Sequence, residues 1–462
     1  MSKSKVLLLN PPGDKVYLRD YYCSKVSKAG YIYEPPDLVI LSGIIAQKHD
    51  VQVLDCIALG LSVHESLERV IDYSPDAIIF ITGLASFKRD FQFLREVKSR
   101  CRSLLIGSGD VFMEDCTKRL AENDFLDAIL LDFTDESILS YLDGVRSVRN
   151  IVCRGAGGII EGERVRWGGE EFDIPSPRHD LFPLERYKYT FVKKKKFATV
   201  LTDYGCPYKC TFCIMSRIGY KVRDVDGVLE ELRVLKGVGI TEIYFDDQTF
   251  AADRRRTVRL LEAMIRENLR FGWCCFFRAD LADEGLIMLM KLAGCHTIIF
   301  GVETASQGLR DEYSKGISGE QIEAAFKLCR KHGIDVVATF IIGLPGETRE
   351  MAEETIQFAL KCGCDYASFN VAVPRVGTLL RKEAQASGLI GADLVEMDQS
   401  GGTVVMGTAQ MGIDEIKSMI DRAVLRFYLR PSYLLWRLSR IKSTYDLTSR
   451  LDGMFGILKN IL

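Results

Sequence analysis

Three cysteines in the middle of the chain constrain its fold and function more than any other feature. Cys206, Cys210 and Cys213 have a C-x3-C-x2-C spacing and follow an apolar run over residues 197–201 that is typical of a strand. A tight loop of this length can turn three thiolates toward one point, and thiolates are the ligands that iron–sulfur clusters prefer. Three cysteines leave one iron of a [4Fe–4S] cube open, so that iron can bind a further ligand and take part in chemistry.

Two alternatives to a cluster remain open at this point. The cysteines could be structural, or they could supply three ligands of a zinc site. A zinc site needs a fourth ligand, usually at finger-like spacing, and no C-x2-C or H-x3-H pair follows this loop. The spacing therefore favours a cluster.

Length, composition and charge limit the remaining classes of protein. A chain of 462 residues suits two or three domains, and its 47% hydrophobic and 27% charged residues are typical of a globular protein. The net charge of -2 gives no electrostatic case for binding nucleic acid. No apolar run approaches the roughly 18 residues of a membrane span, and the first residues lack the layout of a signal peptide. Fourteen scattered cysteines without disulfide-like spacing indicate a reducing cytoplasm.

Residues 1–145 predict a doubly wound (Rossmann/flavodoxin-like) α/β domain. Near-continuous apolar strands alternate with helices, as in a parallel sheet that is covered on both faces. The expected strands are residues 5–9, 51–54, 77–81, 103–106 and 128–131. Such sheets bind ligands beyond the carboxyl ends of their strands. Small or polar residues stand at three of these ends: Thr82 and Gly83; Gly107, Ser108 and Gly109; Asp132, Phe133 and Thr134. The group at 107–109 could be only a tight turn.

Three further regions follow along the chain. Residues 146–195 break the alternation and are expected to be a linker, with a small hairpin at 158–166 and a solvated lysine run at 193–196 that could instead bind phosphate. Residues 196–385 predict a partial (β/α)6 barrel of the TIM type, whose functional residues should stand at strand carboxyl ends. Its strands are expected at 197–201, 241–246, 271–277, 296–302, 334–342 and 366–373. Residues 386–462 predict a mainly helical extension, with amphipathic helices at 413–429 and 431–462.

Several short motifs follow the expected barrel strands. Residues 244–250 end the second strand, 278–280 the third and 301–306 the fourth, and residues 343–347 follow the fifth. Two of these motifs have a structural alternative, since Glu303 could be only a barrel carboxylate in a salt bridge and residues 343–346 only a turn. Together with the cysteine motif, in which Phe212 is the aromatic residue before the third cysteine, they resemble the radical S-adenosylmethionine (SAM) enzymes. The resemblance is to the cobalamin-dependent (class B-like) branch and covers nearly the whole chain.

The resemblance implies three cofactors and a set of contacts for each. A [4Fe–4S] cluster would bind Cys206, Cys210 and Cys213, and its open iron would chelate the amino and carboxylate groups of SAM. SAM would lie against the strand-end motifs, and cobalamin would lie at the carboxyl ends of the first sheet. The implied contacts are Phe212, Asp246, Arg278, Glu303, Ser306, Gly343 and Pro345 for SAM, and Thr82, Gly83, Ser86, Gly107, Ser108, Asp132 and Phe133 for cobalamin.

Two departures from the family pattern stand out. Asp203 and Tyr204 precede the first cysteine, where relatives often have a serine and an arginine. The cobalamin motif Asp-x-His-x-x-Gly is not matched, because the nearest string, residues 55–60, has Ile57 at the histidine position and follows the second strand. No histidine is therefore offered to cobalt, and loss of cobalamin binding is the alternative. The five histidines are expected to be structural or on the surface.

The implied function is a methyltransferase that acts on an unactivated carbon. In that family one SAM is cleaved to a 5′-deoxyadenosyl radical, which removes a substrate hydrogen, and a second SAM supplies the methyl group through cobalamin. A cyclase or ring-rearranging enzyme without methyl transfer is the close alternative, and a non-catalytic iron–sulfur sensor is an alternative of another class. The expected partners are a small-molecule or lipid-like substrate and an electron donor such as flavodoxin or ferredoxin. The C-terminal helices could also lie on a membrane surface.

Overall fold

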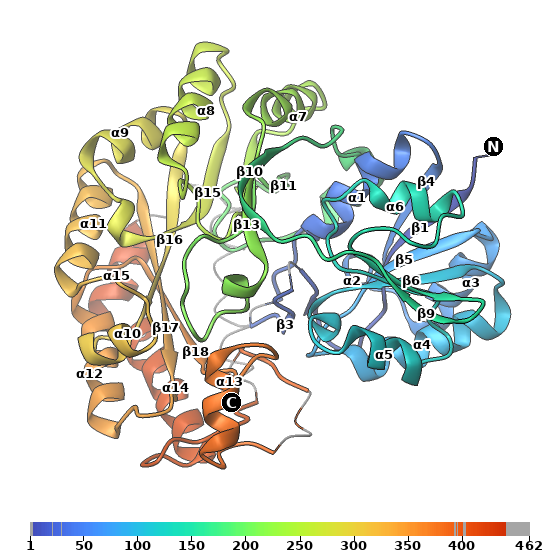
Figure 1. Ribbon diagram of the computed structural model, residues 1–462. Helices are drawn as coiled ribbons and strands as arrows, with labels where there is room; N and C mark the ends of the chain where they lie inside the picture. Colours follow the sequence, from blue (N-terminus) through green and yellow to red (C-terminus); the bar gives the residue numbers. More distant parts are fainter. Residues whose placement is uncertain are drawn as a thin grey trace. The chain divides into compact units, whose positions relative to one another are not determined.

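The computed structural model describes residues 3–20, 22–28, 30–391, 394, 396–400 and 403–439 (Figure 1). The chain divides into two compact units. The first unit comprises the residues up to Ser27, Ile32–Lys188 and Tyr220–Leu235. The second comprises Lys28–Tyr31, Tyr189–Gly219 and the described residues from Lys236 onward.

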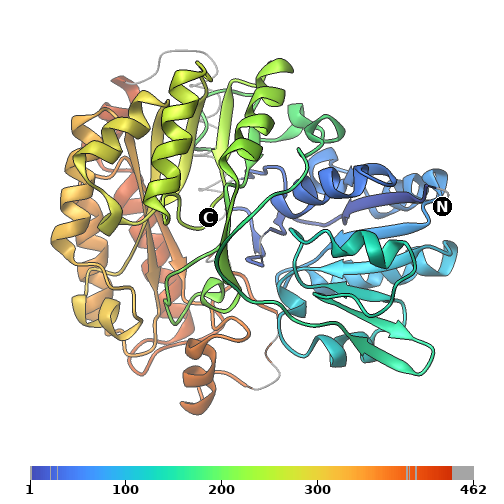
Figure 2. The same cartoon turned by 45° about the horizontal axis from the view of Figure 1, so that its top comes forward.

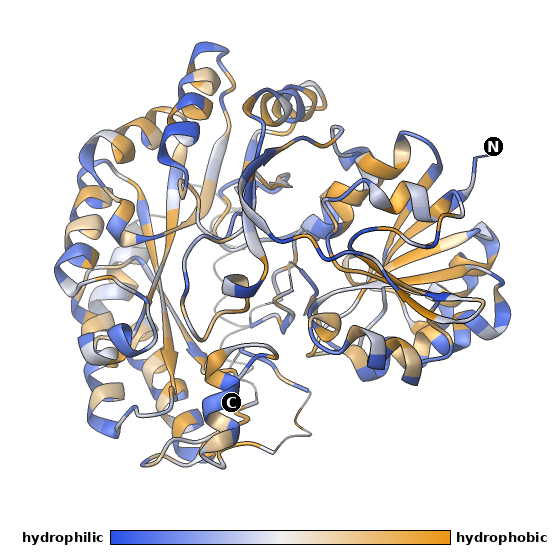
Figure 3. Ribbon diagram, viewed as in Figure 1, coloured by the Kyte–Doolittle hydropathy of each residue, from blue (hydrophilic) through white to orange (hydrophobic). Residues whose placement is uncertain are grey.

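A seven-stranded sheet forms the core of the first unit, in the order β4-β1-β5-β6-β7-β8-β9. Its first five strands are parallel and follow the flavodoxin-like order. They are β4 (Asp50–Asp55), β1 (Lys5–Asn10), β5 (Ala77–Ile81), β6 (Leu104–Ser108) and β7 (Ala128–Leu130). Figure 3 shows the apolar strands of this sheet between helices with hydrophilic outer sides. The doubly wound fold predicted for this region is therefore confirmed.

Helices cover both faces of the sheet, as the sequence predicts. The longer ones are α1 (Pro36–Ala46), α3 (Val63–Tyr73) and α4 (Phe87–Arg100). Shorter ones are α2 (Cys56–Leu59), α5 (Cys116–Glu122) and α6 (Ser137–Leu142). Pro36 occupies the first turn of α1, where a missing N–H has no cost. Asp55 caps α2 by accepting a hydrogen bond from Ala58 N at 3.0 Å, so the string at 55–60 has a structural role.

Residues 146–188, where the sequence predicts most of a linker, contain three strands and lie in the first unit. β8 (Ile151–Gly155) and β9 (Gly158–Glu161) form an antiparallel hairpin that extends the seven-stranded sheet. The hairpin therefore begins earlier than the predicted 158–166, because Ile151, Val152 and Cys153 are buried strand residues. β10 (Trp167–Phe172) follows it. The lysines of the run at 193–196 are exposed or half-buried.

The second unit is built on six parallel strands, each paired with the next along the chain (Figures 1 and 2). They are β11 (Ala198–Val200), β14 (Glu242–Phe245), β15 (Gly272–Phe277), β16 (Cys295–Glu303), β17 (Asp335–Ile342) and β18 (Tyr366–Val371). Helices α8 (Arg254–Arg266), α9 (Glu284–Leu292), α11 (Gly319–Lys331) and α12 (Arg349–Lys361) lie on one face. This arrangement confirms the partial (β/α)6 barrel.

The opposite face of this sheet is the interior of the barrel. From Thr339 onward in β17, and throughout β18, half-buried residues alternate with buried ones. Thr339, Ile341, Ser368 and Asn370 belong to the half-buried set. Because side chains alternate between faces in a strand, these four residues face the interior. The interior near β17 and β18 is thus lined by a mixture of polar and apolar groups.

The C-terminal part of the described chain is helical, as predicted. α13 (Leu379–Ala386), α14 (Ile413–Tyr428) and α15 (Pro431–Ser439) are present, and residues 440–462 of the predicted final helix lie outside the described residues. α14 packs against β18, where the Tyr428 hydroxyl donates to Ala367 O at 2.8 Å. Among the described residues, no helix is long and apolar enough to cross a membrane.

A buried group of four charged residues stabilises the first unit. His179 is 3% exposed, with Nδ1 2.9 Å from Glu34 Oε1 and Nε2 2.9 Å from Glu231 Oε1. The second oxygen of Glu231 accepts a hydrogen bond from Arg223 Nη1 at 2.6 Å. Burial by itself would lower the pKa of His179, but the two carboxylates outweigh burial and raise this pKa to about 10. His179 is therefore an imidazolium that neutralises buried negative charge.

We predict that His179→Ala lowers the free energy of unfolding by about 3–5 kcal/mol at pH 7, because it leaves a buried charge without its partner. Since the folded pKa lies above the ordinary value, the contribution of His179 is complete below about pH 6.5 and is lost as the pH rises toward 10. The difference between wild type and variant should therefore shrink from pH 7 to pH 10. Urea unfolding of the full chain measures both effects.

The exposed His64 provides the control for this substitution. His64→Ala should change the free energy of unfolding by no more than about 0.5 kcal/mol. Equal stability of the His179→Ala variant and wild type at pH 7 would contradict the role assigned to the buried imidazolium.

Candidate functional site

The cysteine loop follows the first barrel strand and is held by backbone hydrogen bonds to distant segments. Cys206 N donates to Gly219 O, and Thr211 N donates to Tyr313 O, each at 3.1 Å. Cys210 is 7% exposed, Cys206 and Cys213 are half-buried, and all three are free thiols. The loop therefore presents three cysteines at the carboxyl end of a strand, where the barrel rule places function.

The three thiols of this loop are available as ligands to an iron–sulfur cluster. Among the described residues, no three His, Cys, Asp or Glu side chains converge closely enough to hold one metal ion. A [4Fe–4S] cube binds each thiolate through a different iron, so its ligands stand apart. Burial raises the pKa of Cys206, which keeps that thiol protonated until a cation stabilises the thiolate.

Arg278, which directly follows β15, contacts the cysteine loop through its guanidinium. Its Nη1 lies 3.9 Å from Cys210 Sγ, and its guanidinium carbon lies 3.6 Å from the centroid of the Tyr208 ring. Tyr208 stands between the first two cysteines. Arg278 therefore contacts both a cysteine and the segment that joins two cysteines.

Glu303 ends β16 in an unusual backbone conformation, with φ +68° after a register shift from Gly301. Its Oε1 accepts a hydrogen bond from Lys315 Nζ at 2.7 Å, and both residues are buried. A Cβ added at Gly301 would lie 2.5 Å from Glu303 Oε1 and 2.7 Å from Lys315 Nζ. The glycine therefore leaves the space that this ion pair occupies, and Glu303 takes part in a salt bridge.

Tyr313 connects the cysteine loop to the loop after β17. Its carbonyl accepts from Thr211, its hydroxyl donates to Pro345 O at 2.8 Å, and its ring lies edge-on to Phe212 with centroids 6.4 Å apart. Leu344 belongs to the same apolar cluster as Tyr313. Phe212 and Pro345, both predicted to contact SAM, are thus joined through one residue.

The other predicted SAM contacts have clear local roles. The Tyr244 hydroxyl donates to Asp246 Oδ1 at 2.5 Å, and Ser306 caps α10 (Gln307–Glu312). Gly343 has φ +93° and donates its N–H to Glu347 Oε2 at 2.5 Å. Burial raises the pKa of Glu347 to about 7. The structure links Phe212, Arg278, Glu303 and Pro345 to the cysteine loop through Tyr313 and Lys315.

Sequence reasoning missed Tyr208, Tyr313 and Lys315. Tyr208 lies inside the cysteine motif, so its position was a usable signal. Tyr313 and Lys315 follow α10, away from any strand end. No periodicity or motif marks them, and only the folded chain brings them to the loop.

In the first unit, two of the hydroxyl groups predicted to contact cobalamin, those of Thr82 and Ser86, form hydrogen bonds within the protein. Thr82 Oγ1 and Ser86 Oγ donate to Asp90 Oδ2 at 2.8 and 2.7 Å, and Arg19 forms a buried ion pair with Asp90 at 2.7 Å. Ser108 differs, because its Oγ is buried and has no hydrogen-bond partner among the described residues. An orphaned hydroxyl at a strand end is available to a ligand.

Glycines bring the ends of β5 and β6 close to neighbouring segments. Gly109 has φ +133°, and a Cβ there would lie 1.9 Å from Thr82 O. A Cβ at Gly83 would lie 2.0 Å from Ser24 Cβ, and one at Gly107 would lie 2.7 Å from the Phe112 ring. The glycines at these strand ends are therefore required by close packing within the unit.

Asp132, at the end of β7, is fully bonded within the first unit. Its Oδ2 accepts from Lys221 Nζ at 3.1 Å and from Trp167 Nε1 at 3.0 Å, and its Oδ1 accepts from Thr134. The adjacent Phe133 packs against Tyr22 with ring centroids 5.9 Å apart. Burial lowers the pKa of Lys221. Sequence reasoning missed Lys221 and Trp167, because neither follows a strand of the first sheet.

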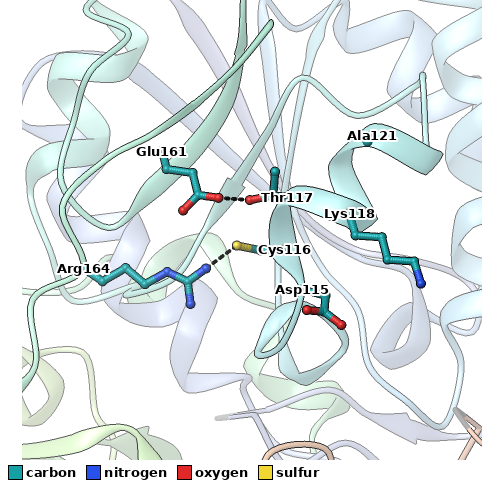
Figure 4. A pocket seen from close by; sticks show the side chains of 7 residues that line it. All are labelled: Asp115, Cys116, Thr117, Lys118, Ala121, Glu161 and Arg164. Carbon is teal, nitrogen blue, oxygen red and sulfur yellow. Dashed lines mark hydrogen bonds between the residues drawn. The ribbon is translucent and has the colours of Figure 1, made fainter. Parts of the chain in front are cut away.

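An open pocket of about 580 Å³ lies elsewhere in the first unit (Figure 4). The Arg164 guanidinium points to the Cys116 thiol, 2.5 Å away, and Thr117 donates to Glu161. Its lining contains none of the predicted cofactor contacts and consists of Asp115, Cys116, Thr117, Lys118, Ala121, Glu161 and Arg164.

Comparisons with known proteins agree with this site. Residues 200–359, which contain the three cysteines, match the model of the radical SAM superfamily. The chain is also 31% identical, over 94% of its length and 95% of the relative's, to an uncharacterised methyltransferase of Pyrococcus horikoshii. The chain belongs to the radical SAM superfamily. The recognition made from the cysteine motif and the strand-end motifs is thereby confirmed.

This radical SAM enzyme is also similar in sequence to a cyclase and in fold to a methyltransferase of known structure. It is 27% identical to the anaerobic magnesium-protoporphyrin IX monomethyl ester cyclase of Rubrivivax gelatinosus, over 70% of this chain and 61% of the cyclase. Its fold matches that of TsrM from Kitasatospora setae, a radical SAM methyltransferase solved with cobalamin and a [4Fe–4S] cluster, with a TM-score of 0.66 and 18% identity. That match covers 85% of this chain and 76% of TsrM, so it includes parts of both units.

We predict that Gly301→Ala weakens SAM binding by about tenfold, or ~1.4 kcal/mol, because the new methyl group displaces the Glu303–Lys315 ion pair. The colliding atoms are the ends of two flexible side chains, so the fold should persist. Calorimetric titration of the reconstituted enzyme with SAM measures the affinity.

Gly237→Ala is the matched control, since a Cβ at Gly237 meets nothing within 4 Å. It should bind SAM as wild type does. Wild-type affinity in the Gly301→Ala variant would show that the ion pair takes no part in SAM binding.

Proposed function

We propose that this radical SAM enzyme is a cobalamin-dependent methyltransferase that methylates an unactivated carbon of a small-molecule or lipid-like substrate. One observation carries the proposal: the similarity to a methyltransferase extends over 94% of the chain, and so includes the doubly wound sheet as well as the barrel. The fold of the chain also matches that of TsrM over 85% of its length, which includes parts of both units. The two units would supply the two cofactor sites that such a methyl transfer requires.

The residues that would hold the cofactors follow from the contacts described above. Cys206, Cys210 and Cys213 would hold the cluster. Ser108, with its orphaned hydroxyl, is the strongest candidate for a cobalamin contact at the ends of the first sheet. When bound, the cluster supplies the electron that cleaves SAM to a 5′-deoxyadenosyl radical, and cobalamin carries the methyl group.

The protein's own residues would bind and orient SAM. Arg278, Glu303 and Lys315 place buried charges near the cysteine loop, where they can receive the amino and carboxylate groups of SAM. Phe212, Tyr313 and the loop containing Pro345 form an apolar wall that can exclude water from a reactive radical. Fixed geometry matters more here than acid–base chemistry, because the cofactors carry the difficult steps.

The substrate and the electron donor are assigned by class only. The half-buried interior residues Thr339, Ile341, Ser368 and Asn370 can offer both polar and apolar contacts to a substrate. The electron would come from a separate protein such as flavodoxin or ferredoxin in the cytoplasm, as the sequence predicts. Peripheral membrane contact stays a prediction.

A radical SAM cyclase is the second candidate, and the 27% identity to the Rubrivivax gelatinosus cyclase favours it. The products of SAM separate the two candidates. A methyltransferase of this type forms S-adenosylhomocysteine together with 5′-deoxyadenosine. A cyclase without methyl transfer forms 5′-deoxyadenosine and no S-adenosylhomocysteine. A non-catalytic sensor forms neither.

We predict that Cys210→Ala abolishes both the cluster and the cleavage of SAM, because only two thiolates would remain. The measurements are the iron and sulfide content after anaerobic reconstitution, and 5′-deoxyadenosine formed with a chemical reductant. Cys101→Ala, at a half-buried thiol in the first unit, is the control and should keep both properties. Cleavage of SAM by the Cys210→Ala variant would refute the enzyme proposal.

We predict that Ser108→Val lowers the corrin retained after reconstitution with hydroxocobalamin and desalting by at least about tenfold. The valine replaces the orphaned hydroxyl with a methyl group and adds a second one, and each tenfold loss corresponds to ~1.4 kcal/mol. Ser99→Val, at an exposed helix position, should retain corrin as wild type does. Absorption spectra report corrin and cluster in the same sample. Full retention by the Ser108→Val variant would remove Ser108 from the cobalamin site.

A further inference from the structure

We propose that Arg278 sets the reduction potential of the cluster by holding a buried positive charge against Cys210. This inference rests on the proposed function, since it requires a cluster on the three cysteines. It assigns Arg278 a positioning and electrostatic role that exists before SAM binds.

The guanidinium of Arg278 is held with one edge toward the thiol. A guanidinium has five N–H donors. Its Nε and Nη2 donate to the two oxygens of Asp280, each at 3.0 Å, and Nη2 also donates to Lys315 O at 2.8 Å. These bonds use the three N–H groups on Nε and Nη2. The remaining edge, Nη1, lies 3.9 Å from Cys210 Sγ.

The surroundings of the Arg278–Cys210 contact strengthen the electrostatic effect of the guanidinium on the thiol. Arg278 is 6% exposed and Cys210 7% exposed, so little water separates or screens them. The Tyr208 ring covers one face of the guanidinium at 3.6 Å, as in a cation–π contact. Electrostatic interactions are stronger in such a low-dielectric region than in water.

Reduction adds one negative charge to a cluster. A nearby cation, or an N–H that points to a ligand sulfur, stabilises the reduced state more than the oxidised state and raises the potential. Asp280 opposes this effect, because it places a carboxylate on the far side of the same guanidinium. Neutralising Arg278 should therefore lower the potential, and neutralising Asp280 should raise it.

A role limited to binding SAM predicts a different result. In that case, substitutions at Arg278 would leave the potential unchanged when SAM is absent. The two roles are thus separated by measuring the potential without SAM, with a readout that does not depend on turnover.

The experiment is an anaerobic redox titration of the reconstituted full chain without SAM, in which the electron paramagnetic resonance signal of the reduced cluster is followed. Arg278→Gln should lower the ratio of reduced to oxidised cluster at a fixed potential by about tenfold, or ~59 mV for a one-electron couple. Asp280→Asn should shift the potential in the opposite direction. Arg278→Lys keeps the charge without the planar fork and should shift the potential less than Arg278→Gln.

Arg254→Gln is the matched control, because Arg254 pairs with Asp283 at a largely exposed position. Its potential should equal that of wild type. The inference is overturned if Arg278→Gln leaves the potential unchanged, or if the Arg278→Gln and Asp280→Asn variants shift it in the same direction. If Arg278→Gln assembles no cluster, Asp280→Asn decides alone, and an unchanged potential overturns the inference. A wild-type chain that assembles no cluster would instead refute the proposed function.

Discussion

A short loop that holds three cluster ligands needs a defined shape when the cluster is bound. Here that shape depends on backbone hydrogen bonds to segments outside the loop, from Cys206 to Gly219 and from Thr211 to Tyr313. The same Tyr313 also holds the loop at Pro345 through its hydroxyl. Tyr313 therefore contacts both the cysteine loop and the loop after β17, so the proposed cluster site and the proposed SAM site share one of their supports.

Buried charge is the second constraint on this chain. Arg278 with Asp280, Lys315 with Glu303 and Arg19 with Asp90 are buried or largely buried pairs. Charges in such positions are tolerated only when they are paired and hydrogen-bonded. In the second unit the pairs face the cysteine loop and can serve chemistry. In the first unit, Asp90 of the Arg19–Asp90 pair instead accepts hydrogen bonds from the hydroxyls of Thr82 and Ser86. Polar residues at strand ends are therefore not by themselves a binding site.

Much of the architecture could be predicted from the sequence, because strand and helix periodicity is a local property. Alternating apolar strands and amphipathic helices indicated both the doubly wound sheet and the barrel. The region at 146–188 was harder to interpret, because glycines and charged residues surround its short strands. Its hairpin extends the sheet because β8 pairs with β7, and a pairing with another segment cannot be read from the local pattern of residues.

The candidate site also has features that the sequence predicts and features that only the folded chain shows. The C-x3-C-x2-C spacing and Phe212 lie within eight consecutive residues, so the sequence by itself was enough to predict the cluster ligands and to indicate the family. Only the tertiary structure decided that Lys315 pairs with Glu303, that Arg278 faces Cys210, and that Ser108 has an orphaned hydroxyl where Thr82 and Ser86 do not. The physical reason is that metal-ligand spacing is set by the loop itself. The partner of a buried charge is set by which distant segments the packed fold brings within hydrogen-bonding distance.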